Sequence, residues 1–216
     1  MDWNPITHYQ EVAVAERYDK ERFSRLTGRI FNALEKAYVG KAFAPFPRTS
    51  SVVDVPCGTG RIAEVLLNMG FRVEGIDISR PMLTVAERKL ARFGDRFRAV
   101  AADIRDYASR STVPFDLALC ARVLMHFPLE EQIGFLKAVS SITRGHVVFT
   151  QSLSTPYHRF RRRAKRLIGN PPSAMYPLTE AELAALLRGA GLREVRRLRP
   201  SRIVSEEIIV VASVGA

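Results

Sequence analysis

The chain has 216 residues and a formal net charge of +11, with 47% hydrophobic and 25% charged residues. This composition excludes a largely disordered chain, and the length accommodates one domain with a substantial core. No stretch approaches the roughly 18 uncharged apolar residues of a membrane span, and the N-terminus lacks the features of a secretory signal, so we expect a cytoplasmic protein.

The N-terminal part of the chain is predicted to be helical. Across residues 7–44 apolar residues recur near helical spacing, with charged residues between them. Gly40, Pro45 and Pro47 are expected to end this section and form a connector. A helical segment before the first strand is informative, because dinucleotide-binding enzymes usually begin directly with the strand.

Strands and helices alternate through the next hundred residues. Apolar and β-branched runs predict five strands, at 51–55, 72–76, 97–101, 115–120 and 146–150. Amphipathic patterns predict helices between them, at about 61–69, 80–93 and 129–143. Ser79 is expected to cap the second helix, whose first turn tolerates Pro81.

The alternation is interrupted after residue 152 by a basic run at 157–166. Between residues 151 and 202 the chain has twelve Lys and Arg against three Glu, a local charge of +9. Such a basic surface attracts anions, phosphate groups, acidic lipid headgroups or nucleic acid without choosing among them. Thr179 then predicts a capped helix, and strands are expected at 192–198 and 207–213.

These elements predict an α/β fold, a three-layer sandwich of a mostly parallel sheet with helices on both faces. The last two strands have no helix between them and are therefore expected to form a hairpin. We expect a single domain over residues 1–216. Its parts are a helical N-terminal cap, a cofactor-binding core, a basic acceptor-side insertion and a closing helix with a strand pair, at 1–48, 49–151, 152–178 and 179–216.

The two cysteines, Cys57 and Cys120, are too few for a disulfide framework or a cysteine metal site. Both lie in apolar, strand-like surroundings, so we interpret them as small buried residues. No metal site is expected.

The turn after the first strand is the most informative stretch. Its two glycines, Gly58 and Gly60, permit a ligand to approach the backbone at a strand–turn–helix junction, which suits a nucleotide-like ligand. Together with Ala63 they also satisfy the dinucleotide fingerprint, and Asp77 follows the second strand. An acidic side chain there accepts hydrogen bonds from the ribose of any nucleoside. The turn alone therefore predicts only an adenosine-type ligand.

Four blocks of sequence together resemble the class I S-adenosylmethionine-dependent methyltransferases: residues 53–61, 75–83, 102–104 and 115–120. Their order and spacing agree with that family over residues 50–150. Pro56 departs from the pattern, since the family most often has glycine there. The resemblance implies a Rossmann-like, seven-stranded sheet with an antiparallel last strand, and S-adenosylmethionine as the cofactor.

The resemblance also implies roles for individual residues toward S-adenosylmethionine. Those facing its methionine portion would be Asp54, Pro56, Gly58 and Gly60, with Ala121 and Arg122 between the methionine portion and the acceptor. Those facing its adenosine portion would be Asp77 at the ribose hydroxyls, Ile78 and Met82 against the adenine, Asp103 at the adenine amino group, and Ile104 beside the ring. Tyr18 lies in the helical preface that, in similar enzymes, folds over the cofactor.

Simpler interpretations stay open for several of these residues. The carboxylates of Asp77 and Asp103 could cap helices or turns, and Ile78 and Met82 could be plain core residues. Arg122 could be a surface ion-pair partner, and Tyr18 could be part of the core.

Methyl transfer from a sulfonium is an in-line displacement that needs no covalent nucleophile. A general base is required only if the acceptor is a hydroxyl or a protonated amine. His126, after the fourth strand, is the candidate catalytic residue, because a histidine can take a proton at neutral pH. It could instead shape its loop by hydrogen bonding to the backbone. His158 is a weaker candidate at the start of the basic run.

We expect a small-molecule acceptor, anionic or linked to a lipid or saccharide. If helical, the run 157–166 would gather its arginines on one side and could contact an acidic membrane surface, or it could be a solvated face without a partner. Nucleic acid is disfavoured, because no RNA-binding module or aromatic platform is present in the sequence. An NAD-linked oxidoreductase and a non-catalytic binding protein with the same fold are the alternatives; the oligomeric state is not predicted.

Overall fold

The computed structural model describes residues 15–18, 24, 26–111, 113–154, 175–200 and 206–215. Their strands are β1 (Ser51–Asp54), β2 (Arg72–Asp77), β3 (Phe97–Ala101), β4 (Phe115–Cys120), β5 (Thr143–Ser152), β6 (Leu192–Leu198) and β7 (Glu207–Val214). The α-helices are α3 (Leu26–Phe43), α4 (Ala63–Asn68), α5 (Arg80–Leu90), α6 (Ile104–Arg110), α7 (Leu129–Ser141) and α9 (Glu180–Gly189), with 3₁₀ segments η1 (Ala91–Arg96) and η2 (Leu124–His126).

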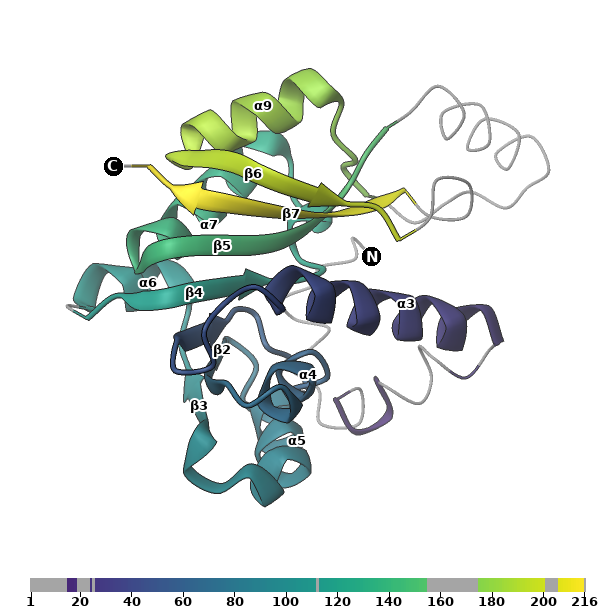
Figure 1. The fold of residues 1–216 in the computed structure, drawn as a ribbon, viewed down its shortest axis with the longest axis vertical. Helices are drawn as coiled ribbons and strands as arrows, with labels where there is room; N and C mark the ends of the chain where they lie inside the picture. Colours follow the sequence, from purple (N-terminus) through teal and green to yellow (C-terminus); the bar gives the residue numbers. More distant parts are fainter. Residues whose placement is uncertain are drawn as a thin grey trace, which may run out of the picture.

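The seven strands form one sheet in the order β3-β2-β1-β4-β5-β7-β6 (Figure 1). β7 runs antiparallel to both of its neighbours, and the other strand pairs are parallel. The predicted seven-stranded sheet with an antiparallel last strand and a closing hairpin is therefore confirmed. The chain order reverses between β1 and β4, where the connections leave the sheet toward opposite faces, and ligands of open α/β sheets bind at such a point.

Helices cover both faces of the sheet, so the three-layer arrangement is also confirmed (Figure 1). Alternation along each strand divides the core in two: Val53 packs with α6, α7 and α9, whereas its neighbour Val52 packs with α3, α4 and α5. The N-terminal helix α3 belongs to the second layer, where Val39, Ala42 and Phe43 are buried. None of the described helices combines the length and apolar character needed to cross a bilayer.

Several element boundaries differ from the prediction. α6 was not predicted, and the helix expected at 80–93 ends at Leu90, where a 3₁₀ segment kinked at Gly94 follows. The helix expected at 129–143 ends at Ser141, because Thr143 already pairs with Phe115 and begins β5. The basic run 157–166 lies outside the described residues, as does most of the predicted helical stretch before residue 26.

Candidate functional site

A cavity of about 250 Å³ lies where β1, β2, β3 and β4 end, at the reversal of strand order. It is lined by residues that follow these four strands, by the start of α7 and by Tyr18. The lining residues are Tyr18, Asp54, Val55, Pro56, Cys57, Gly58, Thr59, Arg61, Ile62, Asp77, Ile78, Ser79, Met82, Ala102, Asp103, Ile104, Arg105, Ala121, Arg122, Val123, His126, Phe127, Glu131 and Phe135. The structure thus brings together every predicted site residue except Gly60.

The two glycines of the turn have different roles. Both have positive φ, at 54° for Gly58 and 70° for Gly60. A Cβ on Gly58 would meet nothing within 4 Å, whereas one on Gly60 would lie 2.6 Å from Leu90 Cδ1 and 3.2 Å from Ala86 Cβ. Gly60 is therefore required for packing against α5, and only Gly58 keeps the cavity wall open to a ligand.

Asp54, at the end of β1, is a buried carboxylate whose charge is only partly compensated. It is 1% exposed, and neither of its oxygens has a hydrogen-bond partner of good geometry among the described residues. Burial raises the pKa of Asp54 to about 8, the charge of Asp77 adds to this, and Arg61 and the Ala63 amide oppose it. A buried carboxylate of this kind is stabilised by a cation or a donor brought by a ligand.

Asp77 ends β2 and organises the turn around the cavity. One of its oxygens accepts a hydrogen bond from the Gly58 N–H at 2.8 Å, and the other accepts from the Ser79 N–H at 2.8 Å. Burial raises the pKa of Asp77, and these amide donors oppose the increase. Each carboxylate oxygen has a further lone pair, so the side chain can still accept hydrogen bonds from a ligand.

The part of the cavity predicted to hold the adenine has both polar and apolar walls. Asp103 caps α6, since its Oδ1 accepts from the Arg105 N–H at 2.8 Å, and it also lines the cavity with its second oxygen available. The two interpretations of Asp103 are thus compatible. Ile78 is 44% exposed although it lines the cavity, whereas Met82 is 3% exposed and lines it from the first turn of α5.

Arg122 is not a surface ion-pair residue. Its side chain is 15% exposed, and Nη1 lies 3.8 Å from Glu35 Oε2 and 3.7 Å from Glu207 Oε2. Arg61, which was not predicted, also lines the cavity and pairs with Glu35 at 2.7 Å. No local pattern in the sequence indicates this cluster, because its members come from distant parts of the chain.

Two aromatic residues of the cavity were also not predicted. Phe127 follows η2, and Phe135 lies on α7; their rings stack with centroids 6.2 Å apart and planes at 27°. Both line the cavity beside His126. Phe127 could have been predicted as a site residue because it directly follows His126. Phe135 could not, because in the sequence it resembles an ordinary core residue of α7.

The loop that presents His126 is fixed by two buried glutamines. Gln132 Nε2 donates to the carbonyl oxygen of Phe127 at 2.7 Å and to that of Tyr176 at 3.3 Å. Gln151 Nε2 in turn donates to Gln132 Oε1 at 2.5 Å. Both glutamines are fully buried. The backbone of the His126 loop is therefore held from α7 and β5 together.

The same region fixes the two chain ends that flank residues 155–174. Leu153 and Leu178 form a parallel bridge, and the Ser154 N–H donates to the Leu178 carbonyl at 2.8 Å. The Tyr176 N–H donates to the Met125 carbonyl at 2.8 Å. The stretch thus leaves and rejoins the described fold beside the His126 loop.

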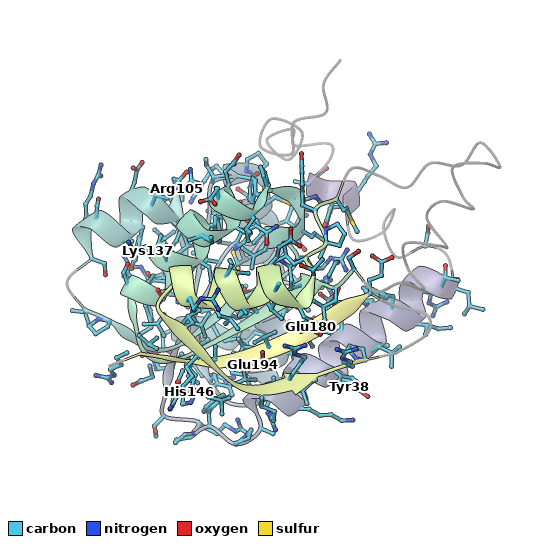
Figure 2. All side chains as sticks on the ribbon, turned by 90° about the horizontal axis from the view of Figure 1, so that it is seen from above. Tyr38, Arg105, Lys137, His146, Glu180 and Glu194 are labelled. Carbon is cyan, nitrogen blue, oxygen red and sulfur yellow. The ribbon has the colours of Figure 1, made fainter. Side chains whose placement is uncertain are left out.

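Two of the three arginines of β6, Arg196 and Arg197, are bonded within the fold. Arg197 bonds Glu180 of α9 and Glu194 of β6, two acids that Figure 2 labels. Arg196 donates to the carbonyl oxygens of Lys41 and Ala42 at the end of α3. The charge of Arg197 is thus paired within the fold, whereas Arg196 keeps its charge while it joins β6 to α3.

The cysteines are buried and free, as expected. Burial raises the pKa of both the Cys57 and the Cys120 thiol, so neither supplies a thiolate nucleophile. Among the described ranges no group of three His, Cys, Asp or Glu is placed to hold a metal ion.

Comparison with known proteins agrees with this geometry. The family model described as "Methyltransferase domain" matches residues 52–145, which include the turn after β1 and the ends of β2, β3 and β4. This part of the chain is thus similar to a methyltransferase domain. The fold neighbours of the chain include magnesium protoporphyrin IX methyltransferase from Synechocystis PCC 6803 with bound S-adenosylhomocysteine, at a TM-score of 0.72 and 19% identity over 88% of this chain and 87% of that one.

A second fold neighbour is CcbJ from Streptomyces caelestis, with a TM-score of 0.72 and 18% identity over 99% of this chain and all of the other. At these identities the two structures show the shared fold. Among curated relatives, ubiquinone biosynthesis O-methyltransferase from Vibrio vulnificus is 28% identical over 153 residues. That match covers 69% of this chain and 63% of the relative's length, so the chain spans less than two thirds of that relative.

Proposed function

We propose that this chain transfers a methyl group from S-adenosylmethionine to a small-molecule acceptor. The observation that carries the proposal is the convergence of three acids on one cavity: Asp54, Asp77 and Asp103, each following a different strand. The partly compensated carboxylate of Asp54 fits the ammonium group of a methionine tail. The acceptor capacity left on Asp77 fits a ribose diol, and that on Asp103 fits the adenine amino group.

The apolar walls fit the same ligand. Ile78 lines the cavity and is 44% exposed, so its side chain is available for contact with an apolar part of a ligand. Met82 and Ile104 are buried beside the opening and provide further contact for an adenine ring. Gly58 lets the methionine portion approach the backbone, next to Pro56 and Ala121, and Tyr18 lines the cavity from the N-terminal part.

When bound, the cofactor supplies an activated methyl group on a positively charged sulfur. The chain's task is to align the two reactants, an effect worth up to about 7–11 kcal/mol in favourable cases. Residues held by buried hydrogen bonds, such as the His126 loop clamped by Gln132, suit that task.

His126 is proposed to stand on the acceptor side and to take a proton when the accepting atom is a hydroxyl oxygen; an amine nitrogen is the other acceptor considered. It lines the cavity together with Phe127 and Phe135, whose stacked rings offer an apolar surface to a small molecule. A general base in this position contributes roughly 10²–10⁴-fold. The relatives named above carry the names of small-molecule methyltransferases, which supports an acceptor of that size.

An anionic acceptor, or contact with an acidic membrane surface, would depend on the run 157–166, which lies outside the described residues. Co-sedimentation with vesicles of an acidic phospholipid at low and high salt tests the membrane contact. Binding that disappears at high salt is expected, and no binding at low salt would remove the idea.

Calorimetric titration with S-adenosylhomocysteine and, separately, with NAD tests the proposed function. We expect heat from S-adenosylhomocysteine and none from NAD; the reverse result would favour an oxidoreductase. The variant Asp77→Ala separates an enzyme from a binding protein that merely keeps the fold, because an enzyme loses cofactor affinity and cellular function together. A screen of cell extract for transfer of a labelled methyl group would then identify the acceptor.

A further inference from the structure

Gln132 occupies a buried position of α7, where an amphipathic helix usually has an apolar side chain. It is fully buried, as is Leu136 one turn later, whereas the preceding residue Glu131 is exposed. Burying a side-chain amide costs free energy unless its donors and its acceptor are bonded. A leucine would fill similar space without that cost, so packing alone does not account for a glutamine here.

The amide of Gln132 belongs to a chain of hydrogen bonds that runs in one direction. The Ser152 N–H donates to Gln151 Oε1 at 2.9 Å, and Gln151 Nε2 donates to Gln132 Oε1 at 2.5 Å. Gln132 Nε2 then donates to the carbonyl oxygens of Phe127 at 2.7 Å and of Tyr176 at 3.3 Å. Because this end of the chain consists of two carbonyl oxygens, only a donor at Gln132 can satisfy it.

These bonds hold the backbone on both sides of His126. Phe127, whose carbonyl Gln132 holds, directly follows His126 in the chain. On the other side, the carbonyl oxygen of Met125 accepts from the Tyr176 N–H at 2.8 Å. The His126 N–H itself donates to the Val123 carbonyl at 3.0 Å. The direction in which the His126 imidazole enters the cavity therefore depends on the Gln132 amide.

Gln132 acts at one remove from the ligands. Among the residues that the structure describes, its side-chain amide bonds only Phe127, Gln151 and Tyr176, and Gln132 does not line the cavity. None of these three partners is among the residues expected to face S-adenosylmethionine. A contribution of Gln132 to the reaction therefore passes through the His126 loop, on the acceptor side.

We propose that Gln132 is a positioning residue for the acceptor side of the reaction. By holding the Phe127 and Tyr176 carbonyls it sets where the His126 imidazole stands, and Gln151 fixes the direction of its amide. The proposal rests on the proposed function, and it adds the buried residue on which the placement of His126 depends. Placement matters because a displacement of about 1 Å can cost on the order of a hundredfold in rate.

The test separates the acceptor side of the reaction from the donor side. Methyl-labelled S-adenosylmethionine is the donor, and cell extract supplies the acceptor. The rate of label transfer at saturating cofactor gives an apparent kcat, and its dependence on cofactor concentration gives KM. Gln132→Met keeps the approximate size and removes the amide, so it should lower the apparent kcat roughly ten- to hundredfold. The KM for the cofactor, and the affinity for S-adenosylhomocysteine in a calorimetric titration, should not change.

Gln132→Glu provides a second readout, the pH profile. When protonated, its carboxyl group can donate to the Phe127 carbonyl and accept from Gln151; when ionised, it faces two carbonyl oxygens without a donor. Burial raises the pKa of a carboxyl group, so the ratio of this variant's rate to the wild-type rate should fall between about pH 6 and about pH 8. The same ratio for Gln132→Met should not depend on pH.

Ser140→Ala is the matched control, because Ser140 Oγ donates a buried hydrogen bond from the same helix to the Ala190 carbonyl at 2.7 Å and does not line the cavity. It should change neither the apparent kcat nor KM. A thermal melt verifies that each variant is folded, and if Gln132→Met does not fold, the pH profile of Gln132→Glu decides.

Three results would overturn the proposal: an unchanged apparent kcat in Gln132→Met, a fall of the same size in Ser140→Ala, or a matching loss of affinity for S-adenosylhomocysteine. A rate ratio for Gln132→Glu that does not vary with pH would also overturn it. A wild-type protein that binds no S-adenosylhomocysteine and transfers no label would instead refute the proposed function.

Discussion

Replacing Asp54 by asparagine should stabilise the ligand-free protein while weakening cofactor binding. The folded state buries this carboxylate without a well-formed hydrogen bond, and asparagine has nearly the same shape without the charge. The measurement is the free energy of unfolding in urea, for wild type and Asp54→Asn, at pH 5 and pH 7. The variant should be the more stable protein at pH 7.

The expected size follows from the pKa of Asp54, which burial raises from 3.8 to about 8. Because the folded-state value is the higher one, the protonated form stabilises the folded state, and this contribution is lost as the pH rises from about 4 to 8. Between pH 5 and pH 7 the loss is about 1.36 kcal/mol per pH unit, or roughly 2.7 kcal/mol. The pKa of Asp77 is raised too, but Asp77 is present in both proteins. The stability difference between variant and wild type should therefore grow by that amount.

Asp116→Asn provides a control of the opposite sign. Asp116 accepts hydrogen bonds from the Ser51 N–H and hydroxyl at 2.8 and 2.9 Å, and these bonds together with Arg144 lower its pKa. The ionised Asp116 stabilises the folded state at every pH above its unfolded pKa of 3.8. Asp116→Asn should therefore be less stable than wild type by the same amount at pH 5 and at pH 7. If the Asp54→Asn difference likewise stays constant between the two pH values, the reasoning about Asp54 is refuted.

Three further predictions concern packing, capping and reactivity. Gly60→Ala should destabilise the fold by roughly 2–4 kcal/mol, since its Cβ would lie 2.6 Å from a leucine of α5, whereas Gly58→Ala should cost only about 1–2 kcal/mol; equal losses in urea unfolding would contradict this. Thr179→Ala removes the capping box of α9 and should cost about 1 kcal/mol, with an unchanged melting temperature counting against it. Cys120, which is fully buried and does not line the cavity, should not react with a thiol reagent until the chain unfolds; rapid labelling of Cys120 in the native protein would contradict this.

The sequence predicted those parts of the site that depend on strand order. Asp54, Asp77 and Asp103 each follow a parallel strand, and the carboxyl ends of adjacent parallel strands meet at one edge of the sheet. Once the strands are assigned correctly, the sequence is therefore sufficient to predict that these three aspartates converge. The capping box of Thr179 was equally local, because its two partners are three residues apart.

The parts that were missed depend on contacts between distant segments. α6 has seven residues, with Ile104 as its one buried residue, so it shows no periodic pattern. Gly60 fits the glycine spacing of the motif, but a glycine is needed there because α5 packs against it. No local sequence pattern predicts this contact. The partners of Arg122 are a glutamate of α3 and one of β7. Such a cluster can be recognised only after the sheet has brought these elements together.

The paired chain ends around residues 155–174 have a consequence for protein engineering. Ser154 and Leu178 are hydrogen-bonded to each other, and the neighbouring Tyr176 is anchored to Met125 and Gln132, so the two attachment points are set by the rest of the fold. A stretch joined at such a fixed base can be exchanged or shortened at a modest entropic cost that depends only weakly on its length. Exchanging the stretch between residues 154 and 175 for that of a related protein is thus a practical test of the proposal that this part of the chain contributes to acceptor binding.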